Sequence, residues 1–315
     1  MPGETVHTTV LLHESIDGLG IQPGDIYLDG TLGGGGHAEY VAQLFADSPD
    51  NCPKITIVGL DEDEDALARA KVRLERTARK IGQLKGDNGV KLFLIKENFR
   101  HLDRALDSVG IPQANRILFD LGLSSDQFET SGRGFSFKKD EPLLMTFSKN
   151  ADLTARHIVN TWDEANIADI IYGYGEEKYA RRIARGIVLA RAEKPIETTF
   201  DLVAIIEKST PFRYHHGKIH PATRTFQALR ITVNDEINAL REGLVKGWER
   251  LAPGGRIAVI SFHSIEDRIV KHFYKEKAVE GKAKILTKKP IIPSDQEIAE
   301  NPRSRSAKLR ILEKL

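Results

Sequence analysis

A run of glycines at the end of a short apolar segment is the first feature that could do chemistry. Residues 26–29, Ile-Tyr-Leu-Asp, are followed by Gly-Thr-Leu-Gly-Gly-Gly-Gly-His at 30–37. Glycine permits positive φ and a close approach of the backbone to a ligand, and the helix start that follows offers free N–H groups. Asp61 ends the next apolar run, where a carboxylate can accept both hydroxyls of a ribose. These residues predict a nucleotide site, with a glycine-rich surface turn as the simpler alternative.

The glycine spacing and Asp61 do not by themselves decide which nucleotide binds. Gly33, Gly35 and Ala38 satisfy the G-x-G-x-x-A spacing of a dinucleotide fold, so this spacing alone does not discriminate. Asp29 directly precedes the glycines, and a carboxylate there suits a cationic methionine moiety better than a pyrophosphate. Four consecutive glycines also exceed what a pyrophosphate turn requires. The residues favour S-adenosylmethionine, and a nicotinamide-dependent oxidoreductase stays open as an alternative.

The elements that must position this loop alternate between strand and helix. Apolar, β-branched runs indicate strands, and apolar residues at helical spacing indicate helices. Their alternation predicts a parallel sheet covered by helices, and therefore an α/β fold. Strand signals are lacking over residues 152–210, which predicts an all-helical insertion at 134–216 between the two parts of the α/β domain, 1–133 and 217–315. The expected strands are 26–29, 54–60, 90–95, 116–119 and 256–262 (after a turn at 253–255), and the expected helices include 37–45, 63–81, 176–191 and one beginning at Asp152.

Composition and charge narrow the class of protein. The 315 residues are 40% hydrophobic and 29% charged, which excludes wholesale disorder. We expect no membrane span, no secretory signal and, with Cys52 as the single cysteine, no internal disulfide. A cytoplasmic protein is therefore the expectation. Residues 1–130 hold 13 basic and 21 acidic side chains, whereas 131–315 hold 33 and 24, which indicates a polyanionic partner for the second part.

A basic cluster in the predicted insertion is a candidate contact for such a partner. Lys178, Arg181, Arg182 and Arg185 stand at i, i+3, i+4 and i+7, which places them on one face of a helix. The alternative is an ordinary solvated face opposite a buried stripe. The positive balance of residues 131–315 makes contact with nucleic acid an equally good interpretation.

Two further segments have side chains that suit a nucleic acid. Residues 132–137, Gly-Arg-Gly-Phe-Ser-Phe, bring Arg133 next to two aromatic rings, which could stack an unpaired base or pack on the core. In the predicted helix 222–240, Arg224, Gln227 and Asn234 lie opposite an apolar face. We expect the apolar face to be core and the polar face to contact substrate.

The histidines invite two other interpretations that we do not favour. His216 and His220 have i, i+4 spacing, but Pro221 follows directly and no nearby cysteine completes a metal site, so no metal is expected. Ser264 follows His263, as in a nucleophile and base pair, but no G-x-S-x-G elbow surrounds it. Helix capping is the expected role of Ser264.

Several longer motifs run almost from end to end of the chain. They are His7-Thr-Thr-Val-Leu-Leu12, the 29–37 loop, residues 120–125 and 133–137, Tyr174-Gly-Glu-Glu177, His220-Pro-Ala-Thr-Arg-Thr-Phe-Gln-Ala228, Ser261-Phe-His-Ser264 with Glu266-Asp-Arg268, and Asn301-Pro-Arg-Ser-Arg305. Together they resemble the ribosomal RNA small subunit methyltransferase H family, which methylates the exocyclic N4 amine of a cytidine in the decoding region of 16S rRNA.

The resemblance implies a Rossmann-like class I methyltransferase sheet with S-adenosylmethionine as cofactor and an RNA-recognition role for the helical insertion. Phe99 would pack against the adenine. Asp120 would accept hydrogen bonds from the target amine, with Ser124 sharing the role, or would only orient the cofactor. The target must be single-stranded or extruded. The implied cofactor residues are Gly35, Gly36, His37, Asp61, Phe99, Asp120 and Gln127.

One departure from the family pattern motivates a further alternative. Where the family reads Pro-Leu-Asp-Met-Arg, this chain has Leu144 and Thr146 at the third and fifth positions of residues 142–146. The loss of an acid and a base there leaves open a non-catalytic factor that binds the ribosome. The implied partner in either case is 16S rRNA within the small subunit, and a homodimer is left open.

Overall fold

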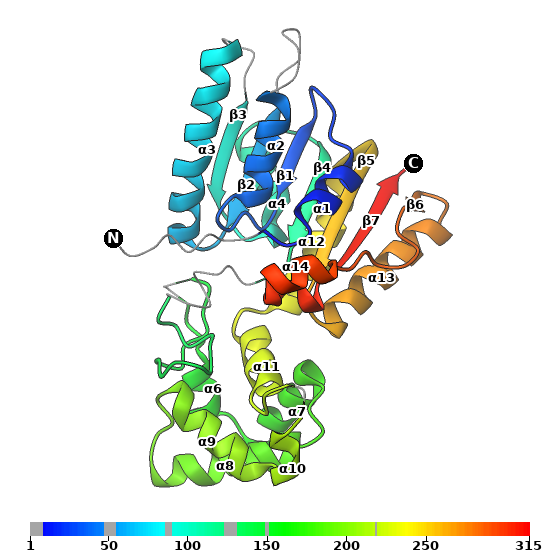
Figure 1. The fold of residues 1–315 in the computed structure, drawn as a ribbon. Coiled ribbons are helices and arrows are strands. Elements are labelled where there is room, and N and C mark those ends of the chain that lie inside the picture. The colour runs from blue at the N-terminus through cyan, green and yellow to red at the C-terminus, as the bar shows by residue number, and fades with distance from the viewer. Residues whose placement is uncertain (1–8, 47–54, 86–89, 123–130, 149–150, 218) are drawn as a thin grey trace. The chain divides into compact units, whose positions relative to one another are not determined.

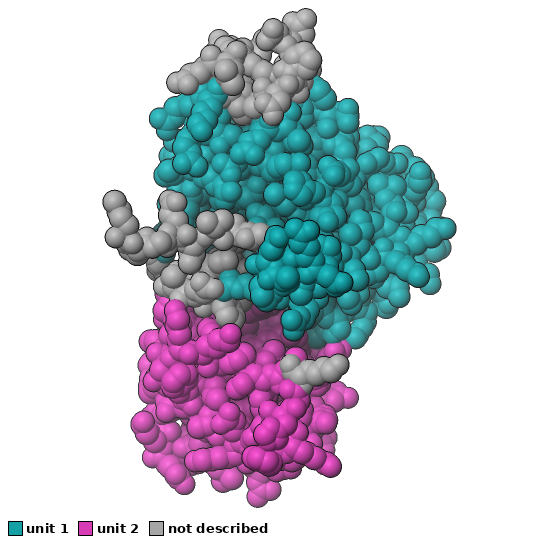
Figure 2. Space-filling view, viewed as in Figure 1, with its two compact units in different colours: residues 1–122, 238–315 teal, residues 123–237 magenta. Residues whose placement is uncertain are grey.

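Two compact units make up the chain, coloured separately in Figure 2. The computed structural model describes residues 9–46, 55–85, 90–122, 131–148, 151–217 and 219–315. We call residues 1–122 and 238–315 the sheet unit, and residues 123–237 the helical unit. Among the described residues, no helix has the length and apolar character needed to cross a membrane.

The sheet unit is built on one seven-stranded sheet with strand order β3-β2-β1-β4-β5-β7-β6 (Figure 1). The first five strands in that order run parallel, and β7 is antiparallel to both of its neighbours. This confirms the predicted Rossmann-like class. The strands are β1 (Ile26–Asp29), β2 (Thr56–Asp61), β3 (Lys91–Lys96), β4 (Ala114–Asp120), β5 (Leu251–Ser261), β6 (Ala283–Ile285) and β7 (Lys308–Lys314).

Helices cover both faces of this sheet because its central strands are apolar on both sides. In β1, Tyr27 belongs to one buried cluster and Leu28 to the other, and in β4, Leu118 and Phe119 divide in the same way. Such strands are typical of parallel sheets. The first cluster includes α1 (Leu12–Leu19), α2 (Gly36–Ala46) and α3 (Glu64–Lys85), and the second includes α4 (Leu102–Ser108), α12 (Glu236–Arg250) and α13 (Ser264–Val279).

The five predicted strands are confirmed, and two details differ. The turn predicted at 253–255 lies inside β5, where Gly254 has φ of 72° and the register with β4 shifts between Ala114 and Arg116. An irregularity of this kind bends a strand without ending it. The C-terminal part also contributes elements that we did not predict: β6, β7, α14 (Asp295–Glu300) and the short 3₁₀ turn η2 (Pro302–Ser306).

The helical unit has its own buried core. Two predicted helix starts were wrong. The first helix begins after the cap Thr154 and not at Asp152, because Thr154 Oγ1 accepts the His157 amide hydrogen. The basic helix begins at Ala180, because Glu176, with φ of 50°, ends the preceding helix. The helices are α6 (Ala155–Thr161), α7 (Glu164–Gly175), α8 (Ala180–Glu193), α9 (Thr199–Ser209), α10 (Phe212–His215) and α11 (Thr223–Val233).

The helical unit extends beyond the predicted insertion at both ends. The segment before α6 packs its apolar side chains, among them Phe135, Leu143 and Met145, into the helical core. Phe226 and Leu229 of α11 join the same core. The compact unit spans 123–237, whereas the prediction placed the insertion at 134–216; Phe226 and Leu229 of the core lie beyond its predicted end.

Candidate functional site

Three aspartates end adjacent strands at the same edge of the sheet. Asp29 is the last residue of β1, Asp61 of β2 and Asp120 of β4. Asp29 pairs in register with Gly59 of β2 and Leu118 of β4, so the other two carboxylates stand two residues further along their strands. The carboxyl ends of parallel strands border the ligand crevice in open α/β sheets. The structure thus brings the predicted residues Asp61 and Asp120 to one edge.

Asp29 is buried beneath the glycine loop. Its side chain is 1% exposed, and its two oxygens accept hydrogen bonds from the Tyr27 hydroxyl at 3.1 Å and the Thr31 amide at 3.2 Å. Burial raises the pKa of Asp29 to about 7. Its contacts hold the start of the loop, and the suitability of this carboxylate for a cationic methionine moiety stays a prediction.

Asp61 holds the middle of the same loop. One carboxylate oxygen accepts the Gly33 amide hydrogen at 2.8 Å, and the other accepts the Asp63 amide hydrogen at 2.8 Å. Burial raises the pKa of Asp61 to about 6, although both hydrogen bonds act in the opposite direction. Each carboxylate oxygen has a second lone pair, so Asp61 can position the loop and still accept a ligand hydroxyl.

The glycine loop needs its glycines for two different reasons. Gly33 and Gly35 have φ of 52° and 77°, which side chains rarely adopt. A Cβ on Gly36 would lie 2.0 Å from Thr9 Oγ1, so the segment before α1 packs directly on the start of α2. A Cβ on Gly34 would meet no atom of the described residues within 4 Å. The backbone at Gly34 therefore faces open space that a ligand can occupy.

His37 and Asp120 face each other beside this loop. His37 is 5% exposed, and its Nε2 donates to the Val10 carbonyl at 3.3 Å, which leaves Nδ1 directed 4.0 Å from Asp120 Oδ2. The Asp120 amide donates to Thr31 Oγ1 at 2.6 Å, and Asp120 Oδ1 accepts the Gly122 amide at 3.3 Å. A fifth of the Asp120 side chain stays exposed.

The electrostatics of Asp120 differ from those of a surface carboxylate. Its protein surroundings raise the pKa of Asp120 to about 7, mainly by desolvation and further by the negative charges of Asp29 and Glu266. A carboxyl group with such a pKa is divided between its two protonation states near neutral pH. Asp120 is therefore a partly exposed acid at this edge whose charge changes in the physiological range.

Phe99 provides an aromatic face at the end of β3. It opens the short 3₁₀ turn η1 (Phe99–His101), and its half-buried ring lies 5.1 Å from the ring of Phe119, tilted by 40°. A Cβ on Gly243 would lie 2.5 Å from Phe99 Cδ2, so α12 packs closely on one side of the ring. The ring is fixed by these contacts, and its remaining surface suits the predicted stacking role.

Two predicted site residues, Ser124 and Gln127, lie outside the described residues. Gly35, Gly36, His37, Asp61, Phe99 and Asp120 all lie in the sheet unit at the carboxyl edge of its strands. Thr9 and Val10 were missed as functional candidates by the reasoning from spacing, because their role depends on packing across the loop. Their one signal in the sequence was membership of the motif at 7–12.

The predicted basic face is confirmed as exposed, with one change in its geometry. Arg181, Arg182 and Arg185 are exposed on α8, whereas Lys178 precedes the helix, which is capped by Tyr179. Aromatic rings lie under two of the charges. Lys178 Nζ stands 5.1 Å from the Tyr179 ring and 5.2 Å from the Tyr214 ring, and the Arg182 guanidinium stands 5.8 Å from Tyr179.

Arg133 does not join this surface. It is only 9% exposed, its guanidinium donates to the Thr146 carbonyl at 3.1 Å and the Phe147 carbonyl at 2.5 Å, and it lies over the Phe135 ring. These bonds hold the segment before α6 and agree with the alternative in which this segment packs on the core, while contact of Arg133 with RNA stays a prediction. Leu144 is half-buried and Thr146 is 4% exposed in that same segment.

The polar side of α11 also has structural partners. Arg224 donates to the Glu176 carbonyl at 2.8 Å, and Gln227 donates to the Tyr174 carbonyl at 2.8 Å, so both satisfy the end of α7. Asn234 donates to the Met145 carbonyl at 2.8 Å and accepts the Phe147 amide at 2.9 Å. These three side chains serve backbone groups of the helical unit, and a contact of Arg224 with RNA stays a prediction.

The histidines take part in local contacts. His215 Nε2 lies 2.9 Å from Thr210 Oγ1, and the His220 ring stacks on Phe137 with ring centres 4.5 Å apart. The cap of α13 is His263 and not Ser264: Glu266 donates its amide to His263 Nδ1 and its carboxylate accepts the His263 amide. The predicted capping role of Ser264 was therefore wrong: Ser264 is the first residue of α13, and His263 before it is the cap.

Comparison with known proteins decides the family. The model of the MraW methylase family matches residues 4–315. The chain belongs to the MraW methylase family. It is 42% identical to "Ribosomal RNA small subunit methyltransferase H" of Brevibacillus brevis, covering 98% of both chains, and 44% identical to the protein of that name in Synechococcus elongatus, covering 100% of this chain and 96% of the relative. A structure from Streptococcus mutans in complex with SAH covers 98% of this chain and 99% of its own, with 14% identity and a TM-score of 0.45.

Membership of the MraW methylase family confirms the predicted methyltransferase class and S-adenosylmethionine as its cofactor. The residues at the sheet edge fit this molecule. Gly34 leaves its backbone open, Asp61 offers acceptors for ribose hydroxyls, and Phe99 offers an aromatic face. The acids also suit a positively charged sulfur, whereas a pyrophosphate would meet repulsion there. A nicotinamide-dependent oxidoreductase is thereby excluded in favour of the methylase.

Proposed function

We propose that the chain methylates the exocyclic N4 amine of a cytidine in the decoding region of 16S rRNA, within the small ribosomal subunit and in the cytoplasm. The names of the relatives at 42–44% identity support an rRNA substrate. The observation that carries the reaction is the partly exposed Asp120 carboxylate, held at the carboxyl edge of β4 beside His37 and the glycine loop.

Asp120 can compensate for the poor nucleophilicity of the target amine. The lone pair of a cytosine amine is delocalised into the ring, so the nitrogen is a poor nucleophile. An ionised Asp120 accepts a hydrogen bond from the amine and draws the nitrogen toward tetrahedral geometry. S-adenosylmethionine, when bound, supplies an electrophilic methyl group on a positively charged sulfur.

The bond changes balance without a further reactant. The nitrogen lone pair forms the new N–C bond while the C–S bond breaks and its electrons stay on sulfur. The nitrogen then carries a positive charge, and its acidic proton leaves to Asp120 or to water. Holding both reactants near attack distance supplies much of the remaining acceleration.

The exposed charges of the helical unit support an RNA partner. Lys178, Arg181, Arg182 and Arg185 present four cations, and Tyr179 and Tyr214 stand under two of them. Cations that track phosphates, together with rings on which bases stack, are a recurring combination in proteins that bind single strands. We infer that these side chains hold rRNA around the target, and a homodimer stays open.

Labelled-methyl transfer tests the proposal directly. Small subunits lacking the modification are incubated with the protein and S-adenosylmethionine labelled in its methyl group, and the rRNA is then digested to nucleosides for mass analysis. We expect label in N4-methylcytidine. Label in another nucleoside would overturn the proposed atom. No transfer, combined with binding of subunits, would instead support the non-catalytic alternative that Leu144 and Thr146 motivated.

A further inference from the structure

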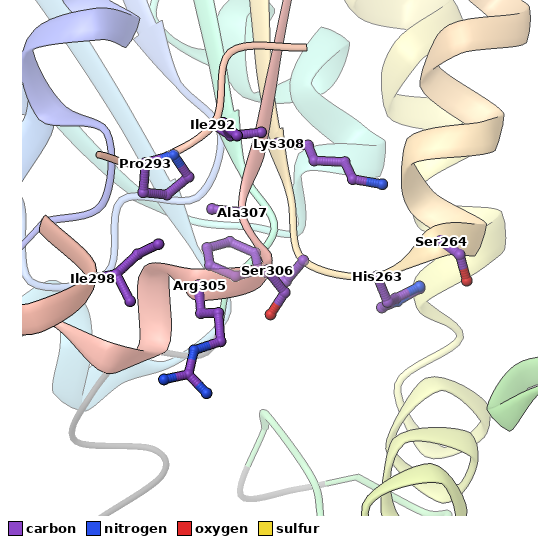
Figure 3. Close-up of a pocket in the computed structure, with 10 residues that line it drawn as sticks. His263, Ser264, Ile292, Pro293, Ile298, Arg305, Ser306, Ala307 and Lys308 are labelled. Carbon is purple, nitrogen blue, oxygen red and sulfur yellow. The ribbon is translucent and has the colours of Figure 1, made fainter. Parts of the chain in front are cut away.

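A cavity lies at the same edge of the sheet, one strand beyond β4. Its volume is about 250 Å³, and residues that follow β5 and residues that precede β7 line it (Figure 3). Figure 3 shows Ile298 and Arg305 on one side, and His263 and Ser264 at the start of α13 across from them. Its lining residues are Phe262, His263, Ser264, Ile292, Pro293, Ile298, Arg305, Ser306, Ala307 and Lys308. All of them belong to the sheet unit.

The register of the sheet places this cavity close to Asp120. Asp120 pairs with Ile260 of β5, and Ser261 of β5 pairs with Lys308 of β7. Neighbouring strands lie about 4.7–4.9 Å apart. The strand of Asp120 and the strand of Lys308 are therefore separated by roughly 10 Å across β5. A ligand in the cavity would lie beside a group held at Asp120.

The charges of the lining select an anion. Arg305 is exposed and has no hydrogen-bond or ion-pair partner among the described residues. Lys308 Nζ forms an ion pair with Asp267 Oδ2 at 3.4 Å, and Asp267 also pairs with Arg310. The described residues that line the cavity include no carboxylate. Ser306 adds an exposed hydroxyl next to Arg305, so an anionic group finds a cation and a donor at one side.

The remaining lining selects a planar or apolar group. Ile292 is 64% exposed, which is costly for a large aliphatic side chain unless something covers it, and Ile298 and Phe262 lie near it in the same cavity. A ligand that fits this lining combines an anionic group with a flat, largely apolar body, as a nucleotide does. A free phosphate would use Arg305 and Ser306 but leave Ile292 uncovered.

We propose that this cavity binds a nucleotide of the rRNA strand that flanks the target cytidine. The phosphate contacts Arg305 and Ser306, and the base covers Ile292. This inference rests on the proposed function, because it assumes an RNA substrate at Asp120. The cavity would fix the position of the strand next to the reacting base and so contribute to the choice of target.

The test compares Arg305→Glu with the matched variant Arg79→Glu, since Arg79 is 76% exposed on α3 in the same unit. Each variant is assayed for methyl transfer to subunits lacking the modification and for binding of a labelled single-stranded oligoribonucleotide at several salt concentrations. We expect Arg305→Glu to raise KM about tenfold or more with a smaller effect on kcat. We expect the slope of log affinity against log salt to fall by about 0.7 for one lost phosphate contact. Arg79→Glu should leave both values unchanged.

A second variant and a competition assay separate the parts of the inference. Ile292→Ser should raise KM without changing the salt slope, because it removes a base contact and no charge. Uridine 5′-monophosphate should compete with the oligoribonucleotide better than inorganic phosphate does, and equal competition would overturn the nucleotide assignment. Equal KM and salt slopes for Arg305→Glu and Arg79→Glu would overturn the site.

The outcomes distinguish this inference from the proposed function. If the unaltered protein methylates cytidine and Arg305→Glu behaves like Arg79→Glu, only the cavity assignment fails. If the unaltered protein transfers no methyl group to rRNA, the proposed function fails, whereas oligoribonucleotide binding still reports on Arg305. A defect of Arg305→Glu with intact subunits but not with protein-free rRNA would show that the cavity takes a ribosomal protein, and would overturn the inference.

Discussion

His37 Nδ1 faces Asp120 Oδ2 at 4.0 Å, while His37 Nε2 donates to the carbonyl of Val10. One imidazole thus spans from the segment before α1 to the carboxylate at the end of β4. The carbonyl of Val10 can only accept, so Nε2 carries the hydrogen and Nδ1 presents its lone pair when the ring is neutral. His37 is therefore held by the segment before α1 through Val10, with its other ring nitrogen facing Asp120.

Replacing Asp120 with asparagine should abolish most of the methyl transfer. The amide oxygen accepts a weaker hydrogen bond than the carboxylate, and no proton acceptor remains at this point. We expect kcat to fall by about 100-fold or more, in the range found for positioned acid and base groups. S-adenosylhomocysteine affinity, measured by calorimetry, should change much less. Retention of at least a third of kcat would contradict the role of Asp120 in the reaction.

The rate of methyl transfer should rise with pH through the neutral range. The surroundings of Asp120 raise its pKa to about 7, and the ionised form is the one that accepts the hydrogen bond. The ionised fraction would grow from about one tenth at pH 6 to about nine tenths at pH 8. Single-turnover rates across this range test the expectation. A flat profile with saturating substrates would show that the charge of Asp120 does not limit the reaction.

The stability of the sheet unit should decrease as pH rises from 5 to 8. An unfolded aspartate has a pKa of about 3.9, whereas burial raises the pKa of Asp29 to about 7. The folded state therefore holds the extra proton between these values, and this contribution to stability is lost as pH passes 7. Asp29→Asn should lower Tm but make it less dependent on pH, as seen by calorimetry. The exposed Asp17→Asn serves as control and should keep the original pH dependence.

Gly34 and Gly36 should respond differently to replacement by alanine. A Cβ at Gly36 would lie 2.0 Å from Thr9 Oγ1, whereas one at Gly34 would meet nothing within 4 Å in the part of the chain that the structure describes. Gly36→Ala should cost about 1–3 kcal/mol in the free energy of unfolding, as overpacking does. Gly34→Ala should leave that free energy nearly unchanged and weaken cofactor binding. Unaltered cofactor affinity in Gly34→Ala would place the cofactor elsewhere.

Charge reversal on α8 should weaken RNA binding. Arg182→Glu combined with Arg185→Glu removes two exposed cations, and each lost phosphate contact should reduce the salt slope by about 0.7 for single strands. Fluorescence anisotropy with a labelled oligoribonucleotide at several salt concentrations measures this. Lys208→Glu, at an exposed position on α9, is the matched control. A salt slope equal to that of the control would remove α8 from the interface.

The strands of the sheet could be predicted from the sequence because local residue patterns mark them. Residues 54–60 and 256–262 are dense in β-branched and apolar side chains that need burial on both faces, and Asp29 and Asp61 stand where such runs end. The glycine loop and the exposure of Arg182 and Arg185 follow from equally local patterns. These parts of the fold and of the candidate site were therefore predictable.

Other parts depend on contacts between distant residues. Arg133 resembles a surface cation in the sequence, yet its bonds to the carbonyls of Thr146 and Phe147 bury it. β7 was missed because its charged residues obscure the strand pattern: Arg310 is 8% exposed only because Asp267 pairs with it. The partners of Arg224 and Asn234 likewise lie outside their own helix. No pattern within a short window identifies such partners.

The Leu11 amide donates to Glu297, a bond that joins residues 286 positions apart. Since the segment around Leu11 also lies against the glycine loop through Thr9, a nascent chain cannot complete this contact until residue 297 has left the ribosome. Closing so long a loop is slow compared with forming local helices. Newly made copies should thus pass through a stage in which most strands of the sheet have formed, but the segment around Leu11 is not yet bound by Glu297 beside the glycine loop.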